Sequence, residues 1–383
     1  MPFYNDLRPE SDFEKADYLQ IFPNLTAKEK LRTIKNLIEL KEGLNNEVAS
    51  RKTDTNLLIA SWNIKEFGHT TQRLPESYFY IAEIITRFDL VAIQEVKSTL
   101  NDFKKIMRLL GSDYEYVLND ITNGNKGNSE RSAYIFNKKR VKFGGLAGEL
   151  NAWDELIKQK SSKITSLSRT PFITGFKAGW KKFALINLHL HPDKSKDKEF
   201  IEDVLRRRAE VQLLLDILQA KIEDDELWTD HLILVGDFNF YPSTKKSEYD
   251  DPTVKLINDA GFVEVESLKG KMTNVSNNTA FDRFFIRTSK YFEIGSSDDA
   301  GNVFKFFNYV FKTSNYLEYS NEMIEAYESG DGKRNIRDND VKKSYFEQYW
   351  KRNQLSDHNL VWFELNIDSS VDFLQSKANK IKN

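Results

Sequence analysis

The chain has 383 residues, of which 40% are hydrophobic and 30% are charged, and its formal net charge is −2. This composition is typical of a soluble folded protein, and the near-neutral charge provides no global attraction to nucleic acid, so binding of a polyanion would need a local patch or metal ions. The absence of cysteine excludes disulfides, thiolate zinc sites and thiol catalysis.

The sequence begins Met1-Pro2-Phe3-Tyr4 and lacks the basic and then apolar run of a signal peptide. It also contains no apolar stretch long enough to cross a bilayer. We therefore expect a cytoplasmic protein that does not associate with membranes; the sequence gives no indication of its oligomeric state.

The first 52 residues favour helices. Ser11 with Glu14 and Thr26 with Glu29 fit capping boxes, in which two side chains satisfy backbone groups at a helix start. No group of catalytic residue types occurs here. We expect residues 1–52 to form a helical extension that packs against the main domain or a partner.

From residue 57 onward, short apolar runs that end in polar clusters alternate with helical stretches. The expected strands are residues 57–62, 90–93, 133–136, 183–190, 232–235, 281–286 and 360–365. The expected helices are residues 78–87, 100–110 and 198–222. This alternation predicts an α+β or α/β domain with a substantial sheet over residues 53–368. We expect a long insertion at about 294–354 and a C-terminal tail at 369–383.

The segment Gly236-Asp237-Phe238-Asn239 follows an apolar run, so Asp237 and Asn239 should face the same way at the end of a strand. A carboxylate and an amide in that position suit a hard cation or a water directed at a phosphate. The same sequence is also typical of an ordinary turn. On these residues alone, both interpretations stay open.

Two further strand ends carry oxygen ligands. Asn63 closes the first apolar run, where it offers a neutral oxygen or forms a turn. Glu95 follows a run too apolar to be half exposed, and a lone carboxylate there would lose several kcal/mol on desolvation. Glu95 therefore needs a cation or a hydrogen-bond donor.

Asn187, His189 and His191 alternate along one strand and so share a face. They fit a two-histidine metal site, a histidine that transfers a proton or contacts a phosphate, or a structural histidine. Glu130 either orients such a histidine or forms a surface pair with Arg131.

Asp357 and His358 are neighbours on an extended segment and should point to opposite sides, so each needs another partner. Asp282, in the apolar run 281–286, is a candidate partner for His358. The alternative is a surface pair between Asp282 and Arg283.

Three basic segments remain. Arg169 and Lys97 each suit contact with a phosphate oxygen. Arg206-Arg207-Arg208 lies on the expected helix 198–222, and we interpret it as a solvated helix face.

Taken in order, these clusters resemble the endonuclease/exonuclease/phosphatase superfamily, and most closely its deoxyribonuclease I branch, over about residues 57–365. The family pattern falls on Asn63, Gln94-Glu95, His189, Asp237 with Asn239, Asp282, and Asp357 with His358. Glu130-Arg131 and Ser168-Arg169 are similar to the branch in which a Glu supports the first His and an Arg contacts phosphate.

The resemblance implies a four-layer sandwich of two packed mixed β-sheets flanked by helices, and phosphodiester hydrolysis with a divalent metal. It assigns Mg2+ or Mn2+ to Glu95, assisted by Asn63 and Asp357. It assigns placement or deprotonation of the attacking water to Asp237 and Asn239.

The resemblance further implies that two histidines flank the scissile phosphate as acid, base or charge stabilisers. His358 would be held by Asp282, and His189 by Glu130. Arg169 and Lys97 would contact phosphate. Lys97 stands where an Arg is usual in the deoxyribonuclease branch, which weakens the argument for a bidentate contact there.

The function that this resemblance implies is a metal-dependent nuclease acting on DNA with little sequence specificity. One alternative is a phosphoesterase of a small or lipid phosphate, of the inositol phosphate, sphingomyelin or nucleotide type. Another, which we rank last, is a binding module without catalysis. The sequence does not separate DNA from RNA, or endonuclease from exonuclease action.

Overall fold

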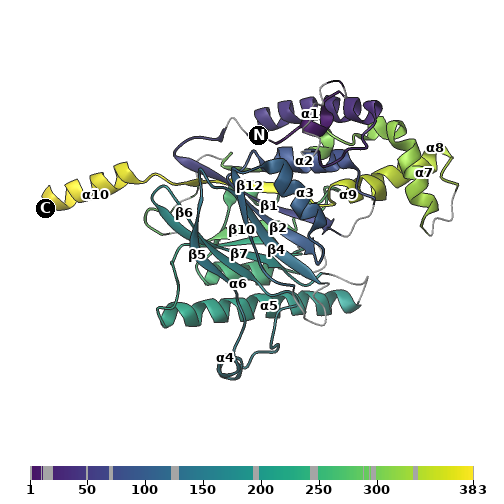
Figure 1. The fold of residues 1–383 in the computed structure, drawn as a ribbon. Helices are drawn as coiled ribbons and strands as arrows, with labels where there is room; N and C mark the ends of the chain where they lie inside the picture. The colour runs from purple at the N-terminus through teal and green to yellow at the C-terminus, as the bar shows by residue number, and fades with distance from the viewer. Residues whose placement is uncertain are drawn as a thin grey trace.

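The computed structural model describes residues 2–9, 11, 20–48, 51–68, 72–121, 129–192, 198–241, 249–287, 289–292, 294, 299–330 and 335–382. Two β-sheets lie face to face between helices (Figure 1). In the described residues each sheet has six strands, and parallel and antiparallel pairs occur in both.

The first sheet has the order β11-β12-β1-β2-β4-β3. Its strands are β1 (Asn56–Phe67), β2 (Leu90–Lys97), β3 (Tyr114–Leu118), β4 (Glu130–Asn137), β11 (Gly301–Phe304) and β12 (Leu360–Asn366). The second sheet has the order β5-β6-β7-β8-β10-β9. Its strands are β5 (Lys142–Glu149), β6 (Phe172–Ala178), β7 (Lys181–His189), β8 (Leu232–Asp237), β9 (Val263–Glu264) and β10 (Asp282–Ile286). The parallel pairs are β1 with β2 and β7 with β8.

Alternation along the strands explains the layering. In β1, Leu57 and Ile59 belong to the core between the sheets, whereas Leu58, Ala60 and Trp62 belong to the core under the outer helices. Successive side chains of a strand point to opposite faces, so a strand buried on both faces is a continuous apolar run. This is why β1, β2, β7 and β8 are so apolar.

The described residues form ten α-helices, some of which cover the outer faces of the sheets (Figure 1). They are α1 (Ala27–Glu47), α2 (Pro75–Ile85), α3 (Asn101–Leu110), α4 (Asp154–Gln159), α5 (Lys198–Glu223), α6 (Asp251–Asp259), α7 (Ser320–Glu328), α8 (Asn339–Tyr345), α9 (Lys351–Gln354) and α10 (Ser370–Lys382). In Figure 1, α1, α2 and α3 lie on the side of the first sheet, and α5 and α6 on the side of the second. The predicted four-layer sandwich is confirmed.

Helix α1 is tied to the main domain by buried polar contacts. The capping box of Thr26 and Glu29 is present at its start. Arg32 of α1 lies 2.5 Å from Glu76 of α2, and both side chains are buried. Glu14, the second member of the other predicted capping box, lies outside the described residues.

All seven expected strands and all three expected helices are present, with boundaries shifted by a few residues. Five strands were not predicted: β3, β5, β6, β9 and β11. Strand β11 lies within the expected insertion and pairs with β12, and α7, α8 and α9 follow it. The expected tail contains α10, which projects from the body in Figure 1.

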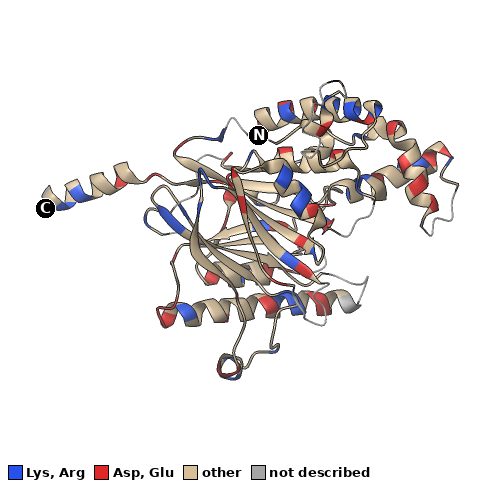
Figure 2. Cartoon of the chain, viewed as in Figure 1, with Lys and Arg blue, Asp and Glu red and all other residues tan. Residues whose placement is uncertain are grey.

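Acidic and basic residues are interspersed along the helices in the view of Figure 2. This agrees with the net charge of −2. None of the described helices has the length and hydrophobicity that a membrane span requires.

Candidate active site

Three predicted residues lie in one row across the second sheet. The register pairs His189 of β7 with Asp237 of β8, and Asp237 with Asp282 of β10. All three are at strand ends, where β7 and β8 finish and β10 begins. The strand order therefore places two carboxylates and an imidazole side by side, although they are far apart in the sequence.

Gly236 allows β8 to lie close to β7 before Asp237. Its φ angle is 132°, which side chains of L-residues rarely tolerate, and an added Cβ would lie 2.1 Å from the carbonyl oxygen of Leu188. Only glycine fits here. The interpretation of residues 236–239 as an ordinary turn thus misses a structural constraint on the position of Asp237.

The first sheet contributes Asn63 and Glu95 from its β1 and β2 strands. The predicted position of Glu95 after a strand is wrong, because Glu95 lies inside β2, where the register with β4 shifts. Its φ angle is 61°, so the strand is locally kinked. Nδ2 of Asn63 donates to Glu95 Oε1 and to Asp237 Oδ2, each at 3.0 Å. Asn63 thereby joins the two sheets at the site.

Oδ2 of Asp237 is the point at which the predicted groups meet. Besides Asn63 Nδ2, it lies 3.6 Å from His189 Nε2 and 3.8 Å from His358 Nε2. Asp237 is only 2% exposed. Burial opposes its ionisation, but the two histidines and the hydrogen bond from Asn63 lower the pKa of Asp237 below the ordinary value. Asp237 is thus held as a carboxylate.

Asn239 lies next to Asp237 with its backbone in the left-handed region, at a φ of 53°. Its backbone N–H donates to Asp237 Oδ1 at 2.9 Å, and its Nδ2 donates to the carbonyl of Leu190 at 3.1 Å. Asn tolerates this conformation better than most residues do. The backbone of Asn239 is therefore tied to Asp237, and its side chain is tied to Leu190, just after the end of β7.

His358 pairs with Asp282 as predicted, with Nδ1 at 2.8 Å from Asp282 Oδ2. Arg283 pairs instead with Glu264 at 3.1 Å, so the alternative of a surface Asp282–Arg283 pair is wrong. Burial opposes the charged imidazolium, yet the carboxylates of Asp282 and Asp237 raise the pKa of His358 well above its usual value.

Two cationic side chains and an imidazole surround Glu130. Glu130 accepts from Arg169 Nε at 2.8 Å and from Lys97 Nζ at 3.0 Å, and its Oε2 lies 3.2 Å from His189 Nδ1. Glu130 Oε2 and His189 Nδ1 are within ion-pair distance, but their geometry does not make a hydrogen bond. Burial would raise the pKa of Glu130, but His189, Arg169 and Lys97 together lower it far below the ordinary value.

Glu130 is 4% exposed, and Arg131 extends to Asp120 instead, at 3.6 Å. The alternative of a surface Glu130–Arg131 pair is therefore wrong. Arg169 and Lys97 both contact Glu130, which also lies beside His189. The two expected phosphate contacts are therefore on the same side of the site.

Asp357 is positioned through its backbone. Its carbonyl accepts from the N–H of Val275 at 2.8 Å, and within the described part of the chain its side chain makes no hydrogen bond or ion pair. Ser356, which is not among the predicted site residues, donates from Oγ to the carbonyl of Asn63 at 2.6 Å and accepts from the N–H of His358. Ser356 thus fixes the Asp357–His358 segment to β1.

One other polar contact supports the site. Gln94 Nε2 donates to Asn187 Oδ1 at 2.7 Å, and both residues are buried between the sheets. The motif containing Gln94 was recognised, but this contact was not predicted. No local signal indicates it, because the partner lies 93 residues away.

His191 is a structural residue. Its Nε2 lies 2.7 Å from Asp203 and its Nδ1 lies 3.2 Å from Ser168 Oγ, so both ring nitrogens are occupied. The two-histidine metal interpretation is therefore wrong. The prediction of a solvated face at residues 206–208 is also wrong for Arg207, which is fully buried and pairs with Asp250 at 3.1 Å.

The oxygen atoms around Asn63 fit a hard divalent cation. Asn63 Oδ1 is buried and accepts no hydrogen bond from the described residues, although Glu95 and Asp237 both bind the Nδ2 of the same amide. Within the described ranges, no three His, Asp or Glu side chains form a ready ligand group. The predicted ligands are the carboxylates of Glu95 and Asp357 and the amide of Asn63. They would leave the other coordination positions to waters and substrate oxygens, as Mg2+ prefers.

The chain is similar to known proteins in both sequence and structure. A sequence model described as "Endonuclease/Exonuclease/phosphatase family" matches residues 60–253, just over half of the chain. Deoxyribonuclease-1 of Bos taurus is 27% identical over 242 residues, 61% of this chain and 78% of the bovine protein. Deoxyribonuclease gamma of Rattus norvegicus is 24% identical over 247 residues, 60% of this chain and 71% of the rat protein. The structure of D. rerio TDP2 complexed with single strand DNA product aligns at 16% identity and a TM-score of 0.46, over 82% of this chain and 100% of that chain.

Proposed function

Because this chain belongs to the endonuclease/exonuclease/phosphatase family, we propose that it is a divalent-metal-dependent nuclease that hydrolyses DNA with little sequence specificity. The match over residues 60–253 confirms the resemblance drawn from the sequence. Members of this family hydrolyse phosphodiester bonds. The similarity of the chain is thus to phosphodiesterases and nucleases in general.

The proposal rests on the groups that surround the carboxylate of Asp237. A buried carboxylate with a lowered pKa lies within 4 Å of two histidines, and each histidine has its own carboxylate partner. Asp237 and Asn239 orient the attacking water, and Asp237 is the proton acceptor. An ordinary structural ion pair would need only one of these partners.

The two histidines act on the phosphate from either side of Asp237. His358, cationic beside Asp282, donates a proton or stabilises charge on the phosphate oxygens. His189, held near Glu130, takes the corresponding position on the other side. Arg169 and Lys97 add positive charge beside His189, which opposes the negative charge of the phosphate.

Glu95, Asn63 and Asp357 are the proposed ligands of Mg2+ or Mn2+. When bound, the cation supplies charge stabilisation at a phosphate oxygen. Asn63 also donates to Asp237, so the same side chain links the metal ligands to the water-positioning carboxylate. This arrangement supports hydrolysis by water rather than by a covalent enzyme intermediate.

DNA is the proposed substrate because the relatives named above are deoxyribonucleases of two kinds, and the similarity to them covers about 60% of this chain. With a net charge of −2, the chain must hold a polyanion locally. Lys97, Arg169 and the metal site provide that local charge.

The test is cleavage of supercoiled plasmid, single-stranded DNA, RNA and inositol phosphates, each with Mg2+ or Mn2+ and with EDTA. We expect metal-dependent nicking of the plasmid, and a fall of about 10³-fold in Asp237→Ala. Asp224→Ala, at an exposed position, is the matched control. Turnover of inositol phosphate without cleavage of any nucleic acid would overturn the proposed substrate. Undiminished plasmid nicking by Asp237→Ala would overturn the site.

A further inference from the structure

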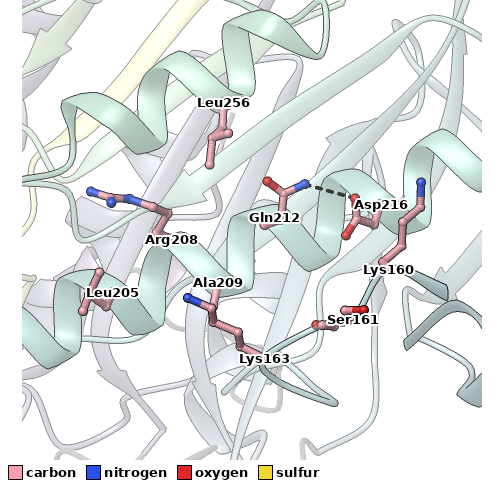
Figure 3. A pocket seen from close by; sticks show the side chains of 10 residues that line it. Lys160, Ser161, Lys163, Leu205, Arg208, Ala209, Gln212, Asp216 and Leu256 are labelled. Atoms are coloured by element: carbon pink, nitrogen blue, oxygen red, sulfur yellow. Dashed lines mark hydrogen bonds between the residues drawn. The ribbon is translucent and has the colours of Figure 1, made fainter. Parts of the chain in front are cut away.

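A cavity of about 550 Å³ lies among the helices outside the second sheet. It is bounded by α5, by Leu256 of α6 and by the segment that follows α4, and Figure 3 shows these three walls. Its volume is in the range of small-molecule sites. No residue of the candidate active site lines it, so its role is separate from the chemistry at Asp237.

The wall on α5 is one stripe of the helix. Leu205, Ala209, Gln212 and Asp216 recur at spacings of three or four residues, which places them on one face. Leu205 is 53% exposed, and it lies on a helix whose other face is buried against the sheet. Together with Leu256, it gives the cavity an apolar surface.

The rim of the cavity is cationic. Lys160 and Lys163 lie on the segment after α4, and both side chains are exposed. Neither ammonium group makes a hydrogen bond or ion pair within the described part of the chain. Unpaired lysines beside an apolar surface are complementary to a ligand that carries a negative head on an apolar body.

The other charged groups of the cavity are already engaged. Arg208 donates to the carbonyl of Tyr249 at 3.1 Å and to Thr253 Oγ1 at 3.4 Å, which fixes its guanidinium near α6. Asp216 is the single acidic residue of the lining, and it accepts from Gln212 Nε2 at 3.0 Å. The lining thus holds three cationic side chains, Lys160, Lys163 and Arg208, against one carboxylate, and its net charge is positive.

We propose that this cavity binds an amphipathic organic anion of small-molecule size. The apolar ring or chain of the ligand lies on Leu205, Ala209 and Leu256. Its carboxylate, sulfonate or phosphate group lies beside Lys163, whose ammonium group points toward the Leu205 end of the cavity in Figure 3, whereas that of Lys160 points toward the other end. This binding is independent of the proposed nuclease function, because the cavity and the site around Asp237 share no residue.

The test uses two fluorescent probes with the same rings: anilinonaphthalene sulfonate, which is anionic, and N-phenylnaphthylamine, which is neutral. The wild-type chain should bind both saturably at one site. Ala209→Trp fills the cavity and should weaken both probes by at least about tenfold. Lys160→Gln/Lys163→Gln should weaken the anionic probe by about tenfold and the neutral probe by less than about twofold.

The matched control is Lys28→Gln/Lys104→Gln, which removes two exposed lysines from α1 and α3. It should bind both probes as the wild type does, and urea unfolding midpoints should show that every variant is folded. The proposal is overturned if the wild type does not bind, if Ala209→Trp binds unchanged, or if the Lys160/Lys163 variant weakens both probes equally. The lysine pair decides the matter even if Ala209→Trp fails to fold.

Discussion

Asp237 and Asp282 face each other across the antiparallel pair of β8 and β10, so two buried carboxylates occupy opposite positions in one sheet. Like charges in this arrangement destabilise a sheet. His358 resolves the conflict, with Nδ1 at 2.8 Å from Asp282 and Nε2 at 3.8 Å from Asp237. The imidazolium is therefore a structural counter-ion as well as a proposed catalytic group.

Replacing His358 by Ala should lower the free energy of unfolding by about 3 kcal/mol, because it leaves Asp237 and Asp282 without their shared cation. In the Asp237→Asn background, the same replacement should cost less than half as much, because one of the two charges is already gone. Urea unfolding of the four proteins in the cycle gives both values. Equal costs in the two backgrounds would show that His358 does not balance this pair.

Two substitutions of Asn239 separate the effect of its backbone conformation on stability from its proposed role in placing the water. At its φ of 53°, Ala is strained by about 1 kcal/mol or more, whereas Gly is not. We expect Asn239→Gly to be more stable than Asn239→Ala by about that amount. Both variants should lose plasmid cleavage by about 10²-fold, because neither has the side-chain amide to which we assign placement of the water.

Urea unfolding and plasmid nicking measure the two effects independently. If Asn239→Gly cleaves at the wild-type rate and Asn239→Ala does not, the residue acts only through its backbone conformation, and the assigned role in water placement fails.

Glu130 should make stability depend on pH. Burial disfavours its charge, but His189, Arg169 and Lys97 outweigh burial and lower its pKa. A lowered pKa means that the folded chain holds the carboxylate more tightly than the unfolded chain does. The resulting stabilisation is fully present above the unfolded-state pKa, about 4.3, and is lost as the pH falls below that value.

Glu130→Gln should therefore be less stable than the wild type by about 2 kcal/mol at pH 7, and the difference should shrink as the pH falls below about 4.3. Urea unfolding across pH 3–7 measures it. Glu155→Gln, at an exposed position of α4, is the matched control and should follow the wild type throughout. A difference that stays constant with pH would mean that Glu130 is not held by charge.

The sequence predicted most strands that are buried on both faces, because their apolar runs are continuous. It missed the internal strand β6, whose run is interrupted by Thr174, Gly175 and Lys177. It did not predict β5, which lies at a sheet edge, is largely exposed and contains Gly144, Gly145 and Gly148. It also missed β9, which has two residues. Edge strands and very short strands bury too little apolar surface to leave a pattern.

Within the site, the pairing of Asp282 with His358 was predictable, because an inward carboxylate in an apolar strand requires a cation. The convergence of Lys97 and Arg169 on Glu130 was not predicted. The three residues are 33 and 39 positions apart, and only the packing of the two sheets brings them together. The prediction that Arg207 is solvated was wrong for a related reason. Its ion-pair partner, Asp250, follows strand β8 in the sequence.

Glu95 provides a test of the proposed metal site that does not depend on catalysis. A cation that binds only the folded chain stabilises it by about 1.4 kcal/mol when its concentration is ten times Kd. For a chain of this size, that raises the unfolding temperature by about 1–2 °C. We expect this rise with Mg2+ or Mn2+ in the wild type and not in Glu95→Gln, because the variant lacks one of the two proposed carboxylate ligands.

Glu66→Gln is the matched control, because the side chain of Glu66 is exposed and only its backbone N–H contacts Glu95, at 2.9 Å. This variant should keep the full rise in unfolding temperature. NaCl at matched ionic strength separates specific binding from screening of charges. Equal rises in Glu95→Gln and the wild type would place the cation elsewhere, whereas a rise lost in both variants would show only that charge near β1 matters.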